Sequence, residues 1–282
     1  MKWRGRRGSR NIEDRRGRSS AGAVGGIGGV GLIVVLVVGY FLGIDVTPLL
    51  QQTGAAPQTV QHELTEADQE VAQFVSVTLA DTEEVWTDLF QRQVGERYVP
   101  PTLVLFSGTT QSPCGGASAA TGPFYCPADR KAYLDTDFFI TLERRFGAGG
   151  DFAAAYVVAH EVAHHVQNEL GILGQANRLR AQVSERESNA ISVRLELQAD
   201  CFSGIWAREA QARFGSLERG DIEEALNAAG QIGDDRIQRA STGVVQPETF
   251  THGTSDQRQR WFLRGLESGD IRACDTFSVD QL

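Results

Sequence analysis

Apolar residues recur with the spacing of an α-helix over several long stretches of the chain. These stretches lie at residues 65–93, 152–170, 185–214, 217–232 and 255–267. Thr65 and Asp151 are suited to cap the first two helices. Two short apolar runs, at 102–107 and 131–135, predict β-strands. The pattern therefore predicts one α+β domain, mainly helical, with a small β-sheet.

A different pattern stands near the N-terminus, where no charged residue occurs between Arg18 and Asp45. Residues 21–44 are 24 uncharged, mostly apolar residues, and about 20 suffice to cross a hydrocarbon core as a helix. We therefore expect one transmembrane helix at 21–44 that is retained as an anchor. The alternatives are a cleaved signal peptide, although no clear small-residue cleavage site follows the run, and a buried core helix, although the run has no polar face.

Charge is distributed unevenly on the two sides of this run. Residues 1–18 contain eight basic and two acidic residues, a net charge of +6, and the whole chain has −9, which leaves −15 for the remainder. Because positive segments stay in the cytoplasm, we expect a bacterial inner-membrane protein with a cytoplasmic N-terminus and a periplasmic or extracellular C-terminal domain. The predicted parts are a basic cytoplasmic tail (1–20), the anchor (21–44), a linker (45–64) and a folded domain (65–282). The acidic balance argues against nucleic acid as a partner.

The four cysteines lie in the part predicted to be outside the cytoplasm, where disulfides form. Cys114 and Cys126 flank a short loop rich in glycine and alanine that a disulfide would close, and Cys201 and Cys274 are then the remaining pair. Four cysteines allow three pairings, and the sequence does not choose among them. The C-x₂-C spacing does not occur, which argues against a zinc cluster.

The predicted helix at 152–170 contains His160, Glu161 and His164 in the pattern H-E-x-x-H. Residues four apart on a helix share one face, so both imidazoles can reach one Zn²⁺. Glu161 lies about 100° round the helix, where it can act as general base on a metal-bound water. The alternative is a pair of structural histidines satisfied by hydrogen bonds. His165 points away from this face and is interpreted as a structural residue or as a support behind the site.

A catalytic zinc site needs a third protein ligand and leaves the fourth position for water. The metzincin class is excluded, because Gln167 and Leu170 occupy the positions where that class has glycine and histidine. A later predicted helix offers another third ligand, because it carries Glu196 and Asp200 one turn apart. We expect Glu196 to complete the site and Asp200 to accept the second N–H of a ligating imidazole. The alternative is that Glu196, two residues after Arg194, lies on a solvent-exposed face of the helix and binds no metal.

Two further residues are candidates for stabilising an oxyanion opposite the metal. His252 and Arg258 both carry suitable donors, and each has the alternative of a loop or helix-capping role. The strand at 131–135 is a candidate for holding an extended peptide by backbone pairing. Its residues Tyr133 and Leu134 have the simpler interpretation of core residues.

The segments HEVAHHVQ and ELQAD resemble the H-E-x-x-H and E-x-x-x-D motifs of gluzincins. The whole chain resembles the bacterial membrane-anchored neutral zinc metallopeptidases, and the similarity runs from KWRGRRGSRNIEDRRG through CGGASAATGPFYCPADRKAYLD to THGTSDQRQRWFLRG. The resemblance implies a zincin-like domain with one zinc ion per chain, bound by His160, His164 and Glu196, with Glu161 as base. It implies no particular substrate.

These observations predict a membrane-anchored zinc endopeptidase that hydrolyses peptide bonds of extracytoplasmic proteins, with a polypeptide as its substrate. The alternative is a catalytically silent, zinc-stabilised scaffold that binds partners through a surface around Trp261 and Phe262. A structural zinc normally has four protein ligands, often thiolates, so metal-bound Cys201 would favour the scaffold. The sequence leaves open the physiological substrate, endo- or exopeptidase action, latency and oligomeric state.

Overall fold

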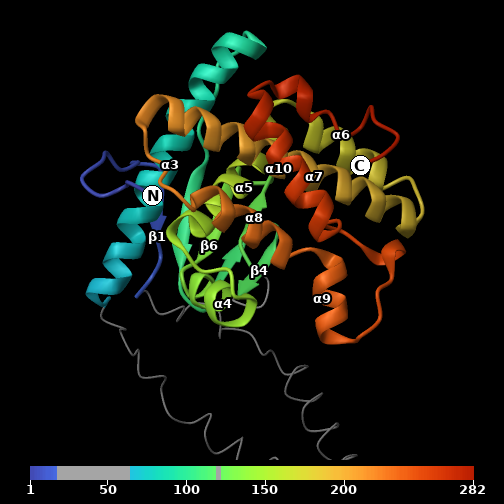
Figure 1. The fold of residues 1–282 in the computed structure, drawn as a ribbon, viewed down its shortest axis with the longest axis horizontal. Helices are drawn as coiled ribbons and strands as arrows, with labels where there is room; N and C mark the ends of the chain where they lie inside the picture. The colour runs from blue at the N-terminus through green and yellow to red at the C-terminus, as the bar shows by residue number, and fades with distance from the viewer. Residues whose placement is uncertain (18–63, 119–121) are drawn as a thin grey trace, which may run out of the picture. The chain divides into compact units, whose positions relative to one another are not determined.

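Helices make up most of the folded chain (Figure 1). The structure is a computed structural model that describes residues 1–17, 64–118 and 122–282. Its α-helices in these ranges are α3 (Glu66–Leu89), α4 (Asp137–Phe146), α5 (Asp151–Glu169), α6 (Ile172–Arg180), α7 (Glu185–Phe214), α8 (Asp221–Gln231), α9 (Asp234–Ser241) and α10 (Ser255–Ser268). Its strands are β1 (Ile12–Asp14), β2 (Thr102–Phe106), β3 (Thr109–Ser112), β4 (Gly115–Ser118), β5 (Phe124–Cys126) and β6 (Lys131–Asp135). The predicted α+β class, mainly helical with a small sheet, is confirmed.

The predicted long elements form near their expected bounds, and the differences have local causes. α3 begins after Thr65, whose hydroxyl accepts the N–H of Asp68 while the Asp68 carboxylate accepts the N–H of Thr65. In α5, by contrast, Gly150 is the N-cap and the expected cap Asp151 lies in the first turn, where it binds the ammonium group of Met1 at 2.8 Å. The pattern does not predict α4, α6 and α9, because helices of eight to ten residues give too short a periodic signal.

The main sheet has four strands in the order β1-β2-β6-β5. β1, β2 and β6 are parallel, with Leu103 opposite both Ile12 and Ala132, and β5 pairs antiparallel with β6 at the far edge. A separate hairpin of β3 and β4 is joined to β5 by the disulfide between Cys114 and Cys126. α5 packs against β5 and β6, so the H-E-x-x-H helix lies beside this edge of the sheet.

The core surrounds α5, which is buried along most of its length among the sheet, α3, α7 and α8. α7 and α10 approach closely: a Cβ atom on Gly204 would lie 2.0 Å from the carbonyl oxygen of Phe262, and one on Gly265 would lie 1.8 Å from that of Cys201. The disulfide between Cys201 and Cys274 joins the same region. The structure thus selects the expected pairing among the three that the sequence allows.

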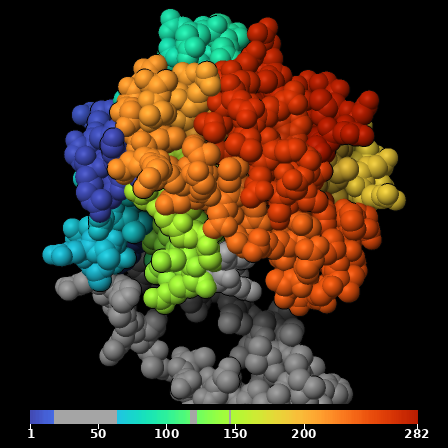
Figure 2. All heavy atoms as spheres, in the orientation of Figure 1, coloured from blue at the N-terminus to red at the C-terminus, as the bar shows by residue number. Residues whose placement is uncertain are grey.

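The N-terminal residues belong to this folded unit, which comprises Met1–Arg15 and Thr65–Leu282. The basic cytoplasmic tail at 1–20 stays a prediction from the sequence. Of its residues, Met1–Arg15 pack in the folded unit, because β1 joins the sheet and the segment lies at the surface beside α3 (Figure 2). The physical reason is that acidic side chains of α3 neutralise arginines of the segment, as Asp81 does for Arg6 at 2.6 Å.

The predicted anchor at 21–44 lies outside the described residues, as does the predicted linker at 45–64 except for Leu64. Within the three described ranges, no helix combines the length and the apolar character that a membrane crossing requires. The anchor therefore stays a prediction from the sequence.

Candidate metal centre

His160 and His164 lie one turn apart on α5, with their ring centroids 4.9 Å apart. The helix stays regular through the motif because the residues around it are alanines and valines that pack in the core. A spacing of four residues turns an α-helix by only about 40° from a full turn, so the two rings point in the same direction. Both side chains therefore face α7.

Glu196 on α7 reaches the same point from the opposite side. Its carboxylate oxygens lie 3.0 Å from Nε2 of His160 and 3.4 Å from Nε2 of His164. One ligand atom from each of the three side chains lies within 4.8 Å of the others. The structure thus brings together the three residues that the sequence predicts as metal ligands.

The charges at this point favour a cation. Burial disfavours the protonated form of His160, but the carboxylates of Asp200 and Glu196 outweigh this effect and raise the pKa of His160 to about 10. Burial also opposes the charge of Glu196, but His164 and His160 hold its pKa well below the usual value. Two imidazoles and one carboxylate are a donor set of catalytic zinc sites. The residues present therefore fit Zn²⁺.

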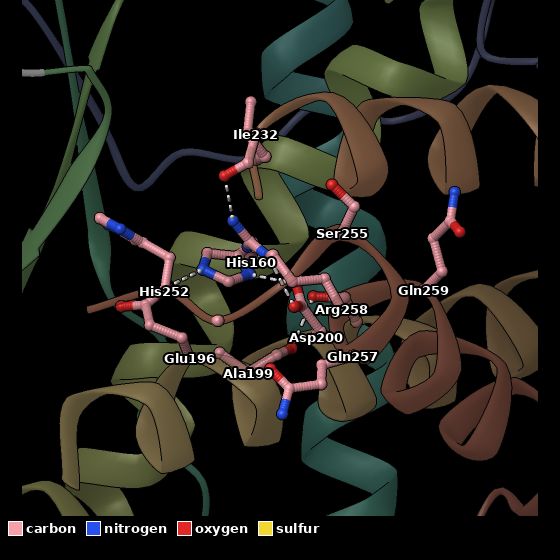
Figure 3. A network of polar contacts seen from close by, with 12 residues as sticks. His160, Glu196, Ala199, Asp200, Ile232, His252, Ser255, Gln257, Arg258 and Gln259 are labelled. Carbon is pink, nitrogen blue, oxygen red and sulfur yellow. Dashed lines mark hydrogen bonds and ion pairs between the residues drawn. The ribbon is translucent and has the colours of Figure 1, made fainter. Parts of the chain in front are cut away.

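A buried network lies behind His160 (Figure 3). Nδ1 of His160 lies 3.0 Å from Oδ1 of Asp200, at ion-pair distance. Arg258 on α10 donates from Nε and Nη2 to the two oxygens of Asp200 at 2.8 and 3.0 Å, and the Tyr156 hydroxyl donates to Oδ1 at 2.5 Å. Although burial opposes ionisation, Arg258 and His160 keep the pKa of Asp200 below its usual value. Asp200 thus lies where the sequence predicts it, beside the ring nitrogen that faces away from Glu196.

This geometry gives Arg258 a different role from the expected one. Its guanidinium also donates to the Tyr156 hydroxyl and the carbonyl of Ile232, so its donors are used to hold Asp200 and its surroundings. Arg258 therefore supports Asp200. The sequence analysis did not predict that Tyr156 supports Asp200, although Tyr156 lies four residues before His160 and therefore on the same face of α5.

His164 has a separate support. The amide oxygen of Gln167 lies 2.9 Å from Nδ1 of His164, while the amide nitrogen of Gln167 donates to the carbonyl of Leu195 at 2.7 Å and to the side chain of Gln198 at 3.1 Å. These bonds fix Gln167 as an acceptor, so Nδ1 of His164 carries the proton and Nε2 is left for a metal. The sequence could have indicated this role, because Gln167 lies three residues after the predicted ligand His164 on a buried helix.

Glu161 lines the cavity in front of the histidines with its side chain almost fully buried. Among the described residues, none hydrogen-bonds to its Oε2 atom. Burial raises the pKa of Glu161 above its usual value, which makes the carboxylate a stronger base. Such a carboxylate is suited to accept a proton from a water molecule in the cavity.

His252 lies on the loop before α10 and lines the same cavity with a half-exposed side chain. Asp234, at the start of α9, holds this loop: its Oδ2 atom accepts the N–H groups of Thr251, His252 and Gly253. The other oxygen of Asp234 lies 3.1 Å from Nδ1 of His252, and this contact raises the pKa of His252 above its usual value. An imidazolium at this place is a donor for a developing negative charge. No local sequence motif joins Asp234 to His252, so the sequence analysis did not predict that Asp234 holds this loop.

His165 faces the other side of α5 and is fully buried. Its Nε2 donates to the carbonyl of Val99 at 2.7 Å, and the Tyr125 hydroxyl donates to its Nδ1 at 3.0 Å. Burial lowers the pKa of His165 to about 4. It is a neutral structural residue, which is one of its two expected interpretations.

A cavity of about 750 Å³ opens in front of the three predicted ligands. Its apolar wall includes Phe124, Tyr125, Phe138, Leu173, Leu195 and Ile237. β5 is the edge strand at this cavity, whereas β6 lies between β2 and β5. The expectation that the strand at 131–135 holds a peptide is therefore wrong, because both of its sides are already paired. Tyr133 and Leu134 are core residues, as in the simpler interpretation.

Comparison with known proteins supplies the family. The sequence profile of the family described as "Putative neutral zinc metallopeptidase" matches residues 1–277. "Uncharacterized protein YpfJ" of Escherichia coli K12 is 48% identical over 286 aligned residues, which cover 98% of this chain and 99% of the relative. "Uncharacterized protein Rv2575" of Mycobacterium tuberculosis H37Rv is 50% identical over 195 residues, which cover 66% of this chain and 65% of the relative. No solved structure matches the chain. The chain therefore belongs to the family of neutral zinc metallopeptidases.

Proposed function

We propose that this protein is a zinc-dependent endopeptidase that cleaves extended segments of extracytoplasmic proteins. The observation that carries the proposal is the cluster of His160, His164 and Glu196 at the wall of an open cavity, with the carboxylate of Glu161 beside it. A structural zinc site normally uses four protein ligands, whereas a catalytic site uses three and leaves one position open. Three ligands beside a cavity therefore favour catalysis.

The side chains of the site have distinct roles in this proposal. A zinc ion bound by the three ligands supplies a Lewis acid for the scissile carbonyl and the attacking water. Glu161 accepts a proton from that water and delivers it to the leaving amine. His252 donates a hydrogen bond to the carbonyl oxygen as negative charge develops on it. Asp200 and Gln167 keep the Nε2 atoms of the two imidazoles directed at the metal.

The cavity indicates how a polypeptide would be held. β5 lies at the sheet edge beside the ligands, so an extended peptide can add to it through backbone hydrogen bonds. The apolar wall, including Phe138, Leu173 and Ile237, favours apolar side chains next to the cleaved bond. We therefore expect the enzyme to cleave unfolded or extended segments in preference to folded surfaces.

The place of action is also a proposal. The two disulfides are typical of an oxidising compartment outside the cytoplasm. The apolar run at 21–44 supports attachment to the inner membrane. Together they favour an enzyme that works at the outer face of that membrane.

The alternative of a catalytically silent scaffold loses both of its supports. Cys201 is bonded to Cys274, so it is not a fourth metal ligand. Trp261 and Phe262, the expected partner surface, are buried in the core. The enzyme is therefore the favoured hypothesis.

Peptide cleavage by the purified full chain with zinc, wild type beside Glu161→Gln, tests the proposal. The amide keeps the size of the side chain but does not accept a proton, so turnover should fall by about 10²–10⁴-fold. Zinc content should stay at one ion per chain. Mass spectrometry of the products from an unfolded-protein library gives the preferred bonds and distinguishes endo- from exopeptidase action.

Glu169→Gln is the matched control, because it makes the same change at the end of α5, where Glu169 pairs with Arg130. It should cleave like the wild type. Equal cleavage by the wild type and Glu161→Gln would contradict the proposal. Failure of both to cleave, with zinc bound to each, would return the scaffold to first place.

A further inference from the structure

The N-terminal segment, defined as Met1–Arg15, is built into the catalytic domain through its side chains. Met1 and Trp3 are only 6% and 4% exposed and belong to the same hydrophobic core as α3 and α5. The Trp3 ring packs edge-on against Phe74 of α3, with 5.5 Å between the ring centroids. The ammonium group of Met1 binds Asp151 at the start of α5, so the segment contacts the helix that carries the predicted metal ligands.

The backbone of the segment is also paired with the domain. β1 extends the main sheet in parallel with β2. Before β1, the N–H of Ser9 donates to the carbonyl of Ser76 on α3 at 2.9 Å, and the N–H of Lys2 donates to the carbonyl of Ser216 after α7 at 2.7 Å. Figure 2 shows the segment in blue on the surface, next to α3 in cyan. The hydrogen bonds therefore join the segment to three separate parts of the domain.

Basic side chains of the segment are neutralised within the molecule. Arg6 donates to both carboxylate oxygens of Asp81 at 2.6 and 2.7 Å and lies over the ring of Phe214. Asp81 is almost fully buried, so removal of Arg6 would leave a buried carboxylate without its cation. Two further pairs on α3 join Arg4 to Glu70 and Arg7 to Glu84.

This packing conflicts with the membrane arrangement that the sequence alone predicts. A single crossing by residues 21–44 puts the residues before it and after it into different compartments. The structure instead combines Met1–Arg15 with Thr65–Leu282 in one folded unit. Separation would uncover the edge of β2, expose Trp3 and leave Asp81 without Arg6.

We propose that the N-terminal segment and the folded domain Thr65–Leu282 lie in one compartment, on the same side of the membrane. Arg4, Arg6 and Arg7 then serve as partners of acidic residues on α3, and they are not a signal that keeps the N-terminus in the cytoplasm. The proposal does not depend on peptidase activity, because the contacts that carry it involve none of the predicted metal ligands.

An engineered disulfide tests the contact in the full chain in its native membrane. A Cβ atom on Gly8 would lie 3.4 Å from Cβ of Ser76, near the separation of bonded cysteines. The four native cysteines are already paired, so they do not compete. On mild oxidation, Gly8→Cys with Ser76→Cys should crosslink and change the mobility on a non-reducing gel. The control pair, Gly8→Cys with the exposed Ser278→Cys, should crosslink about tenfold less.

Compartment labelling tests the proposal without requiring a new bond. The single variants Arg10→Cys and Arg178→Cys each place one exposed thiol, on the segment and on α6. In intact spheroplasts, a membrane-impermeant maleimide should label both variants or neither. Labelling of only one variant, as a single crossing requires, would overturn the proposal even where the paired variant fails to fold. A crosslink no stronger than that of the control pair would also count against it.

Discussion

The pKa values of the buried histidines on the two faces of α5 are shifted in opposite directions. On the face toward α7, acidic side chains raise the pKa of His160 to about 10 despite burial. On the other face, where the hydrogen-bond partners are the Val99 carbonyl and the Tyr125 hydroxyl and the Glu169 carboxylate is 4.0 Å away, burial lowers the pKa of His165 to about 4. The two residues are on one helix and are both buried. The difference teaches that partners from other elements, and not burial alone, decide whether a buried imidazole favours positive charge.

The same difference explains which face is the candidate metal centre. A metal cation replaces a proton most readily where the surroundings already favour positive charge, and Glu196 and Asp200 provide such surroundings. The hydrogen-bond partners of the two His165 nitrogens are neutral, and its one carboxylate neighbour, Glu169, lies 4.0 Å from Nε2. The comparison can therefore be tested by substitutions that remove charge on the metal-binding face and by one that removes the neutral imidazole of His165 on the other face.

The largest effect is expected from removal of the carboxylate that α7 contributes. Glu196→Gln keeps the size of the side chain but loses its charge, so zinc affinity should fall by more than about 100-fold, beyond the range for residues that only support ligands. Elemental analysis gives the zinc content, and circular dichroism checks the fold. Glu185→Gln, an exposed change on the same helix, is the control and should bind zinc fully. Full zinc content in Glu196→Gln would remove Glu196 from the ligand set.

The next effect concerns the cation behind the metal-binding face. Arg258→Leu leaves Asp200 buried without its two-point partner, which should lower the free energy of unfolding by about 3–5 kcal/mol. Arg258→Lys keeps the charge and should lose less. Urea denaturation of the metal-free proteins measures both changes. A loss within the roughly 0.5 kcal/mol of ordinary surface substitutions would show that Asp200 does not depend on Arg258.

A smaller, pH-dependent effect is expected from the other face. The pKa of His165 is 6.5 in the unfolded chain, its ordinary value, and about 4 in the fold, so the unfolded chain binds more protons between these values. The corresponding stability, about 3 kcal/mol, is fully present above pH 6.5 and is lost as the pH falls toward 4.

Comparison of the wild type with His165→Gln measures this contribution. The variant lacks the titrating group, so the stability difference between the two proteins should shrink by about 3 kcal/mol as the pH falls from neutral to about 4. Urea denaturation at a series of pH values gives the difference directly. A difference that stays constant with pH would show that His165 is not held neutral by burial.

The smallest effect extends the comparison to a partly exposed histidine. The contact with Asp234 raises the pKa of His252. If the imidazolium stabilises the oxyanion, activity falls as the pH rises through that pKa. Asp234→Asn keeps an oxygen for the loop N–H groups but removes the charge, so the alkaline limb of kcat/KM should move to lower pH. An unchanged limb would separate His252 from catalysis.

The sequence predicts the parts of the site that depend on spacing along one helix. His160 and His164 share a face because of helical geometry alone, and Thr65 with Asp68 starts α3 through contacts within four residues. The supports of the site are harder to predict, because each bridges separate elements. Asp234 contacts a residue 18 positions away, and Arg258 contacts one 58 positions away.

The position of the N-terminal segment is a further feature that depends on contacts between distant segments and not on local spacing. Its arginines next to an apolar run are typical of a cytoplasmic tail, and a prediction from charge pattern alone follows that statistical rule. The structure pairs Arg6 with Asp81, 75 positions away, and adds β1 to a strand about 90 residues further along the chain. A three-residue strand has too short a pattern to be recognised before its partner is known.

By itself, the sequence determined the mainly helical class, the shared face of His160 and His164, and the presence of a glutamate suited to join them. These features depend on periodicity and on residue chemistry, which act over a few positions. Only the tertiary structure decided that α7 brings Glu196 to the two imidazoles, that Arg258 serves Asp200, and that β5 and not β6 forms the edge of the sheet. The physical reason is that packing and hydrogen bonding between distant segments leave no periodic trace in the sequence, whereas the electrostatics of a buried site depend on those contacts.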